Sequence, residues 1–176
     1  PGEELARIQR ALARTQDRAG AFNLIERLAQ PYSQSADVKL VLANAAQAAG
    51  LSARAVQEAR AAYAIAPDSA RAALTAAQYL QASDRPAALA LLQDFVARHP
   101  TVADTRLAYA RLLIADGKFD AARSEFQSLL QADPKNPDLV YSMALLSMQG
   151  KLPADARTYL QRYLELIAQM DDERAG

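Results

Sequence analysis

Alanine recurs along this chain at a nearly constant interval. Two series keep this interval: Ala55, Ala88, Ala122 and Ala156 form one, and Ala43, Ala76, Ala110 and Ala144 form the other. A fixed period in this range is typical of a chain built from stacked copies of one supersecondary unit. Because stacked units present extended surfaces, the repeat directs the search for function toward binding.

The composition indicates an all-α protein. Of 176 residues, 51% are hydrophobic but only 6% are aromatic, and alanine, leucine, glutamine and arginine are abundant. Alanine has the highest helix propensity, and the other three are also good helix formers. Valine, isoleucine and threonine, which favour strands, are scarce.

Helical periodicity occurs twice within each repeat. In one of them, an apolar face at Leu42, Ala43 and Ala46 predicts a first helix, which ends at Gly50. A second helix follows and is closed by Pro67, which can supply no backbone N–H. Small residues on both helices allow their axes to approach closely, so the sequence predicts antiparallel helix pairs.

These positions resemble the tetratricopeptide repeat, a helix–turn–helix unit of about 34 residues. In that family small residues recur at the eighth and twentieth positions, a bulky residue at the twenty-fourth and proline at the thirty-second. One repeat of this chain matches through Ala76, Ala88, Leu92 and Pro100, and three others agree in register. The resemblance implies a right-handed α-solenoid of antiparallel helix pairs. The large aromatic residue often found at the fourth position is absent, and Lys39, Ala72, Arg106 and Val140 stand there.

The same register predicts how the chain is divided. We expect a single solenoid over residues 1–176, with repeats at 36–68, 69–102, 103–136 and 137–170. Residues 1–35 fit less well and are predicted to be a degenerate first repeat, with an unrelated helical hairpin used as a cap as the alternative. Because the chain opens with Pro1 and not with Met, we expect a segment excised from a longer protein.

The resemblance also implies where a partner binds, because the first helix of each repeat lines the concave side in this family. The exposed positions expected there are Leu40, Asn44, Gln47, Ala77, Leu80, Leu107, Arg111, Ile114, Tyr141, Leu145 and Met148. This groove is largely apolar, which suits an amphipathic helix or an extended apolar peptide. The alternative is that many of these residues pack against neighbouring helices. Only Asn44 fits the basic and amide pattern of family members that bind a chaperone tail, which argues against that partner.

A second candidate surface is the last predicted helix, from about Ala154 to Met170. Its apolar stripe consists of Tyr159, Leu160, Tyr163, Leu164 and Ile167. A solenoid needs a polar terminal cap to keep such a face from water, so part of the stripe is expected to lie bare, and Tyr159, Tyr163 and Ile167 are the candidate oligomer residues. Two explanations stay open. Either the parent chain continues with more repeats, or this end forms a homodimer with a second copy.

The sequence offers little for catalysis or for metal and cofactor binding. His99 is the only histidine and cysteine is absent, so no nucleophile system or thiolate metal site is expected. His99 stands at a predicted helix end, where protonation gains from the helix dipole. Twenty acidic and twenty basic residues cancel, which argues against DNA or RNA binding. We expect no enzyme activity, cofactor or metal.

The leading functional hypothesis is therefore a protein–protein interaction scaffold that binds a peptide or a partner subunit in its concave groove. The alternative is a structural or regulatory repeat segment of a larger protein, such as an enzyme whose catalytic domain lies outside these residues. No stretch of the sequence is long and apolar enough to span a bilayer. The alanine-rich, cysteine-free composition resembles bacterial sequences and suits either the cytoplasm or the periplasm and cell envelope.

Overall fold

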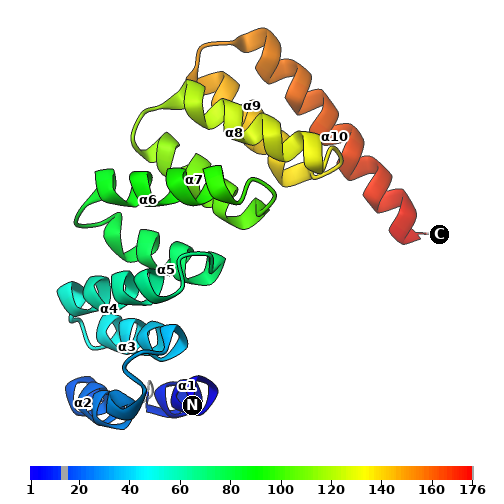
Figure 1. Ribbon diagram of the computed structural model, residues 1–176. Coiled ribbons are helices and arrows are strands. Elements are labelled where there is room, and N and C mark those ends of the chain that lie inside the picture. Colours follow the sequence, from blue (N-terminus) through cyan, green and yellow to red (C-terminus); the bar gives the residue numbers. More distant parts are fainter. Residues whose placement is uncertain (13–15, 176) are drawn as a thin grey trace. The chain divides into compact units, whose positions relative to one another are not determined.

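The computed structural model describes residues 1–12 and 16–175, and side chains at 1–10 and 16–171. Within those residues the chain forms ten α-helices, one short 3-10 turn and no strand, which confirms the all-α prediction (Figure 1). In order they are α1 (Gly2–Leu12), α2 (Arg18–Ala29), the 3-10 turn (Gln30–Tyr32), α3 (Ala36–Ala48), α4 (Ser52–Ile65), α5 (Ala70–Leu80), α6 (Arg85–Arg98), α7 (Ala103–Ala115), α8 (Phe119–Ala132), α9 (Pro137–Gln149) and α10 (Pro153–Ala175).

The contacts divide the chain into two parts, an N-terminal half of residues 1–99 and a C-terminal half of residues 100–176. The border lies close to the predicted repeat border at residue 102. Helices α1 to α6 belong to the first half and α7 to α10 to the second. The single solenoid over residues 1–176 stays a prediction.

The recurring alanines are all buried inside the helix pairs. Their exposed fraction is 0% at Ala43, Ala55, Ala76, Ala88, Ala110, Ala122 and Ala144, and 5% at Ala156. Ala43 of α3 packs with Ala59 of α4 and Ala76 of α5, so a single close contact joins three helices. Ala55 instead belongs to the cluster of Ala46. From the repeat spacing one would expect Ala43 and Ala55, the small residues at the eighth and twentieth positions, to form the close contact between the two helices. That expectation is wrong, because Ala59 lies one turn further along α4 and takes the place of Ala55.

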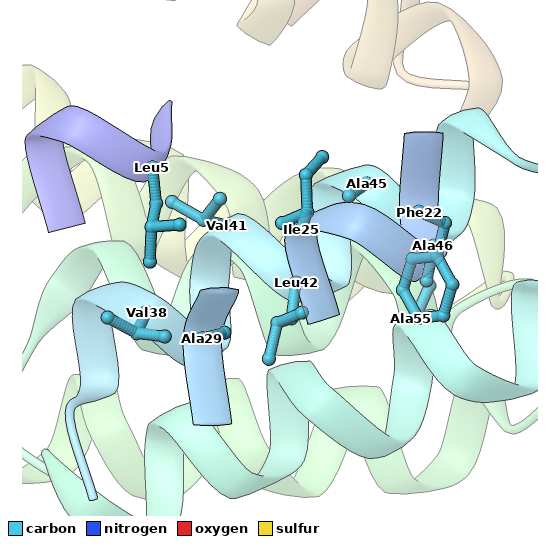
Figure 2. Close-up of a cluster of buried hydrophobic side chains, with 10 residues drawn as sticks. All are labelled: Leu5, Phe22, Ile25, Ala29, Val38, Val41, Leu42, Ala45, Ala46 and Ala55. Carbon is cyan, nitrogen blue, oxygen red and sulfur yellow. The ribbon is translucent and has the colours of Figure 1, made fainter. Parts of the chain in front are cut away.

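The first two helices pack on the third through ordinary apolar contacts. Figure 2 shows Leu5 of α1 and Ile25 of α2 in one cluster with Val41 of α3. Helix α2 ends at Ala29, just before Pro31 in the short 3-10 turn. Helices α1 and α2 thus cover one face of α3.

Helices α3 and α7, each the first helix of its repeat, end in a Schellman motif. In this motif the residue after the helix adopts the left-handed backbone conformation. Gly50 follows α3 with φ of +77°, and the N–H of Leu51 donates to the carbonyl of Ala46 at 2.8 Å. Gly117 follows α7 with φ of +75°. Glycine suits both positions because it has no Cβ to strain there.

The end of α9 has the same motif with a different residue in it. Gly150 stands one repeat position earlier than Gly50 and Gly117 do, and its φ is −75°. Lys151 therefore takes the left-handed position, with φ of +56°. The N–H of Leu152 still donates to the carbonyl of Ser147 at 2.8 Å. A side chain in this conformation costs about 1 kcal/mol.

The family often has a large aromatic residue at the fourth repeat position. In two helix pairs of this chain a basic residue stands there instead and forms an ion pair with the second helix. Lys39 Nζ lies 2.8 Å from Glu58 Oε2, and Arg106 Nη1 lies 2.5 Å from Glu125 Oε2. In each case the basic residue is on the first helix and the acidic residue is on the second, 19 residues later. Glu58 is only 2% exposed and also accepts from Arg54 at 2.9 Å. The carboxylate is therefore buried but neutralised.

The other two helix pairs have apolar residues at the same two positions. Ala72 and Leu91 stand there in α5 and α6, and Val140 and Tyr159 in α9 and α10. The fold thus accepts either an ion pair or an apolar pair between the two helices.

We expect Lys151→Gly to raise the free energy of unfolding by about 0.5–1 kcal/mol, because relief of the left-handed strain exceeds the entropy that glycine adds to the unfolded chain. Lys118→Gly is the matched control, since Lys118 has φ of −87° and gains no relief. Urea denaturation measures both variants. A Lys151→Gly variant that is less stable than the parent contradicts the assignment of strain.

We expect Glu58→Leu alone to lower the free energy of unfolding by about 2–3 kcal/mol, because it leaves Lys39 beside an apolar side chain. The double variant Lys39→Ala with Glu58→Leu, which copies the Ala72–Leu91 pair, regains at least half of that loss. Urea denaturation of both single variants and the double variant gives the coupling energy. Additive losses in the double variant would show that the ion pair and the apolar pair are not interchangeable.

Candidate partner-binding surfaces

Three residues predicted to line the partner groove in the N-terminal half are buried. Leu40, Ala77 and Leu80 are 5%, 3% and 2% exposed. Leu40 packs against Ala62 of α4 and Ala72 of α5, so it fills space between neighbouring helices. The assignment of these three to a surface is therefore corrected: they are core residues, as the alternative interpretation held.

Asn44 and Gln47 are exposed, as expected, but Asn44 already has a structural role. Its Oδ1 accepts a hydrogen bond of 2.6 Å from the hydroxyl of Tyr79, which connects α3 to α5. Burial raises the pKa of Tyr79, so the phenol keeps the proton that it donates. Gln47, Gln78 and Tyr79 line a hollow of about 510 Å³ beside this bond.

In the C-terminal half, three of the predicted groove residues are exposed and apolar. Tyr141, Leu145 and Met148 are 43%, 43% and 58% exposed. They lie four and three residues apart on α9, and residues with this spacing share one helix face. We call these three residues the α9 stripe. On α7 of the same half, Leu107 and Ile114 are half-buried, while Arg111 is exposed.

The predicted oligomer residues Tyr159, Tyr163 and Ile167 are all half-buried on α10. The ring of Tyr163 packs on that of Tyr141, with 5.2 Å between their centroids and 43° between their planes. Tyr163 therefore supports the α9 stripe and offers a second copy only part of its ring.

The most exposed large apolar residue that we can place on α10 is Leu164, which belongs to the apolar stripe expected on the last helix. Leu164 is 64% exposed, whereas Leu130, at the same repeat position on α8, is 8% exposed. Leu164 lines a hollow of about 550 Å³ between the end of α9 and α10. We call this hollow the end groove, and its apolar lining is Met148, Leu152, Pro153, Ala156, Leu160 and Leu164.

His99 caps the end of α6, as predicted from its position. Its Nε2 lies 3.0 Å from Asp68 Oδ1, and its ring packs on Phe95 at 4.5 Å between centroids. Among the residues that the structure describes, no group of three acidic, histidine or cysteine side chains is placed to hold a metal ion. In the same part of the chain, no helix is long and apolar enough to cross a membrane.

Comparisons with known proteins agree with the fold. Two sequence models described as tetratricopeptide repeat match residues 74–137 and 113–175. Cellulose synthase operon protein C of Pseudomonas fluorescens is 33% identical over a stretch that covers 44% of this chain and 7% of that protein. This chain therefore corresponds to a small portion of a much longer relative.

Several solved structures have the same fold at low sequence identity. MamA has a TM-score of 0.77 at 17% identity, over 97% of this chain and 94% of that chain. MamA from Desulfovibrio magneticus RS-1 has a TM-score of 0.75 at 16% identity, over 97% of each chain. YrrB, described as a TPR protein with an unusual peptide-binding site, has a TM-score of 0.68 at 16% identity, over 92% of this chain and 84% of that chain. These structures show the fold alone. The two tetratricopeptide repeat models, which together span residues 74–175, show that the chain belongs to the tetratricopeptide repeat family.

Proposed function

We propose that this chain, whose repeats form a protein-interaction scaffold, binds an apolar segment of a partner protein along the α9 stripe and performs no catalysis. The observation that carries the proposal is the exposure of Tyr141, Leu145 and Met148, which are between 43% and 58% accessible on one helix face. Apolar side chains grouped on a surface are typical of protein-binding sites. The similarity to YrrB, whose description names a peptide-binding site, supports the same use of the fold.

The chemistry of the stripe favours a protein partner over nucleic acid. The chain has a formal net charge of zero, whereas nucleic-acid binding depends on an excess of basic residues that neutralise phosphates. An amphipathic helix or an extended apolar peptide would bury the three side chains, and Tyr163 would hold the ring of Tyr141 in place.

A second candidate function is a structural or regulatory repeat segment within a larger protein, such as an enzyme with its catalytic domain elsewhere. The observation that favours it is the match to cellulose synthase operon protein C, of which the aligned stretch is only 7%. Here the α9 stripe would contact another part of the parent chain, and a cell-envelope setting would suit the relative's name.

Self-association through Tyr159, Tyr163 and Ile167 also stays a prediction. Because all three side chains are half-buried, a second copy would gain less apolar area there than the sequence pattern indicates. Sedimentation of the purified chain over a concentration series measures it directly.

We expect Leu145→Glu to weaken partner binding at least tenfold, because a carboxylate would then be desolvated within the apolar contact. Peptides selected from a random displayed library on the parent chain serve as the probe, and fluorescence anisotropy measures their Kd. Gln127→Glu, on an exposed position of α8 outside the stripe, is the matched control. Circular dichroism checks that both variants keep the parent's helix content and thermal midpoint. Selected peptides that bind the Leu145→Glu variant as tightly as the parent would place the site elsewhere.

A further inference from the structure

A glutamine interrupts the series of buried alanines in the first helix pair. Gln9 stands one repeat period of about 34 residues before Ala43, and the same step back from Ala55 leads to Ala21. Ala43 and Ala55 are 0% exposed, whereas Gln9 of α1 and Ala21 of α2 are both half-buried. The small residue found at this position in the other repeats is therefore missing from α1.

A hollow of about 180 Å³ lies beside Gln9, between α1, α2 and α3. We call this space the α2 hollow, and its apolar lining consists of Ala21, Phe22, Ile25, Ala45 and Ala48. Phe22, Ile25 and Ala45 are 5%, 2% and 4% exposed and belong to one core cluster (Figure 2). Because an apolar cavity of about 150 Å³ takes up one benzene molecule, the α2 hollow has room for a single ring or branched chain.

Two polar side chains complete the lining, namely the amide of Gln9 and the guanidinium of Arg18. In the part of the chain that the structure describes, Arg18 makes one hydrogen bond, from Nη1 to the carbonyl oxygen of Ala48 at 3.5 Å, and no ion pair. The neighbouring carboxylate of Asp17 caps α2, since its Oδ1 accepts a hydrogen bond of 2.8 Å from the N–H of Gly20. A positive charge therefore lies beside an apolar space that holds one ring.

We propose that the α2 hollow binds a small monocarboxylic acid that has one aromatic ring or one branched aliphatic chain. The apolar group packs on Phe22 and Ile25, and the carboxylate pairs with Arg18, whose guanidinium can donate two parallel hydrogen bonds to it. The amide of Gln9, which also lines the hollow, is a further donor. Larger ligands are disfavoured, because sites for drug-sized molecules have volumes of about 300 Å³ or more.

This site goes beyond the partner site proposed above. The α2 hollow lies in the N-terminal half and is lined by α1, α2 and α3, whereas the α9 stripe belongs to the C-terminal half. The two sites share no residue, so the Leu145→Glu experiment tests only the stripe.

The direct test is a titration of the isotope-labelled chain with phenylacetate, followed by two-dimensional NMR of the backbone amides. We expect saturable shifts at the residues that line the hollow, with a Kd below about 10 mM for a ligand of this size. Phenylacetamide is the matched ligand, because it has the same ring without the charge, and it should bind about tenfold more weakly or worse. Equal binding of the acid and the amide, or no saturable shift with phenylacetate, would overturn the proposal.

Variants show whether the acid occupies the hollow. Arg18→Gln should weaken phenylacetate binding by about tenfold or more and leave phenylacetamide unchanged, because only the ion pair is lost. Ala21→Leu places a larger side chain in the hollow and should abolish binding of both ligands. Arg27→Gln, at an exposed position of α2 that does not line the hollow, is the matched control. Phenylacetate binding that Arg18→Gln does not weaken contradicts the site.

Circular dichroism checks the fold of these variants. Because Arg18 is exposed and Ala21 is half-buried, each variant should keep the parent's helix content and thermal midpoint. If Ala21→Leu loses helix content, the Arg18→Gln variant decides the question alone.

The end of a polypeptide has the same chemistry, and a peptide that ends in phenylalanine tests for it. We expect this peptide to bind no more tightly than phenylacetate, because the hollow has room for one ring only. A peptide that binds about tenfold more tightly or better, and that Arg18→Gln releases, would assign the hollow to a protein terminus and overturn the small acid as its occupant.

Discussion

The close approach of helices at fully buried alanines is the contact on which the rest of the structure depends. Ala43, Ala59 and Ala76 come from three consecutive helices and meet with none of their surface exposed. With only a methyl group on each, the helix axes lie close together, and the larger neighbours Tyr63 and Tyr79 pack around them. Dense packing of this kind leaves no room for an added methylene.

This contact also decides which residues reach the surface. Where successive helices pack tightly, as α3, α4 and α5 do, even long side chains such as Leu40 and Leu80 are buried. On α9 the stripe residues stay accessible, and so does Leu164 on α10. The buried alanines themselves take no direct part in binding.

The sequence predicted the repeat period, the helix pairs and the helix-ending role of Gly50, because each rests on local propensity or on spacing. The sequence did not predict which face of a first helix is buried. Leu40 and Ala77 are buried and Asn44 is exposed, and this difference depends on where the neighbouring helices lie. The Lys39–Glu58 pair was missed for the same reason, as its residues are 19 positions apart on different helices. Leu164 was expected in the apolar stripe of the last helix, but its greater exposure than that of the other stripe residues depends on what packs next to it.

The central claim, that the alanines set the distance between helices, is tested most directly by enlarging one of them. Ala76→Leu should lower the free energy of unfolding by about 1–3 kcal/mol through overpacking at the three-helix contact. Ala90→Leu, at an exposed position of α6, should change it by less than about 0.5 kcal/mol. Urea denaturation measures the free energy of unfolding of both variants, and its slope against urea concentration should equal that of the parent. An Ala76→Leu variant as stable as the parent would contradict the account, because it would show that the helices do not depend on a small residue there.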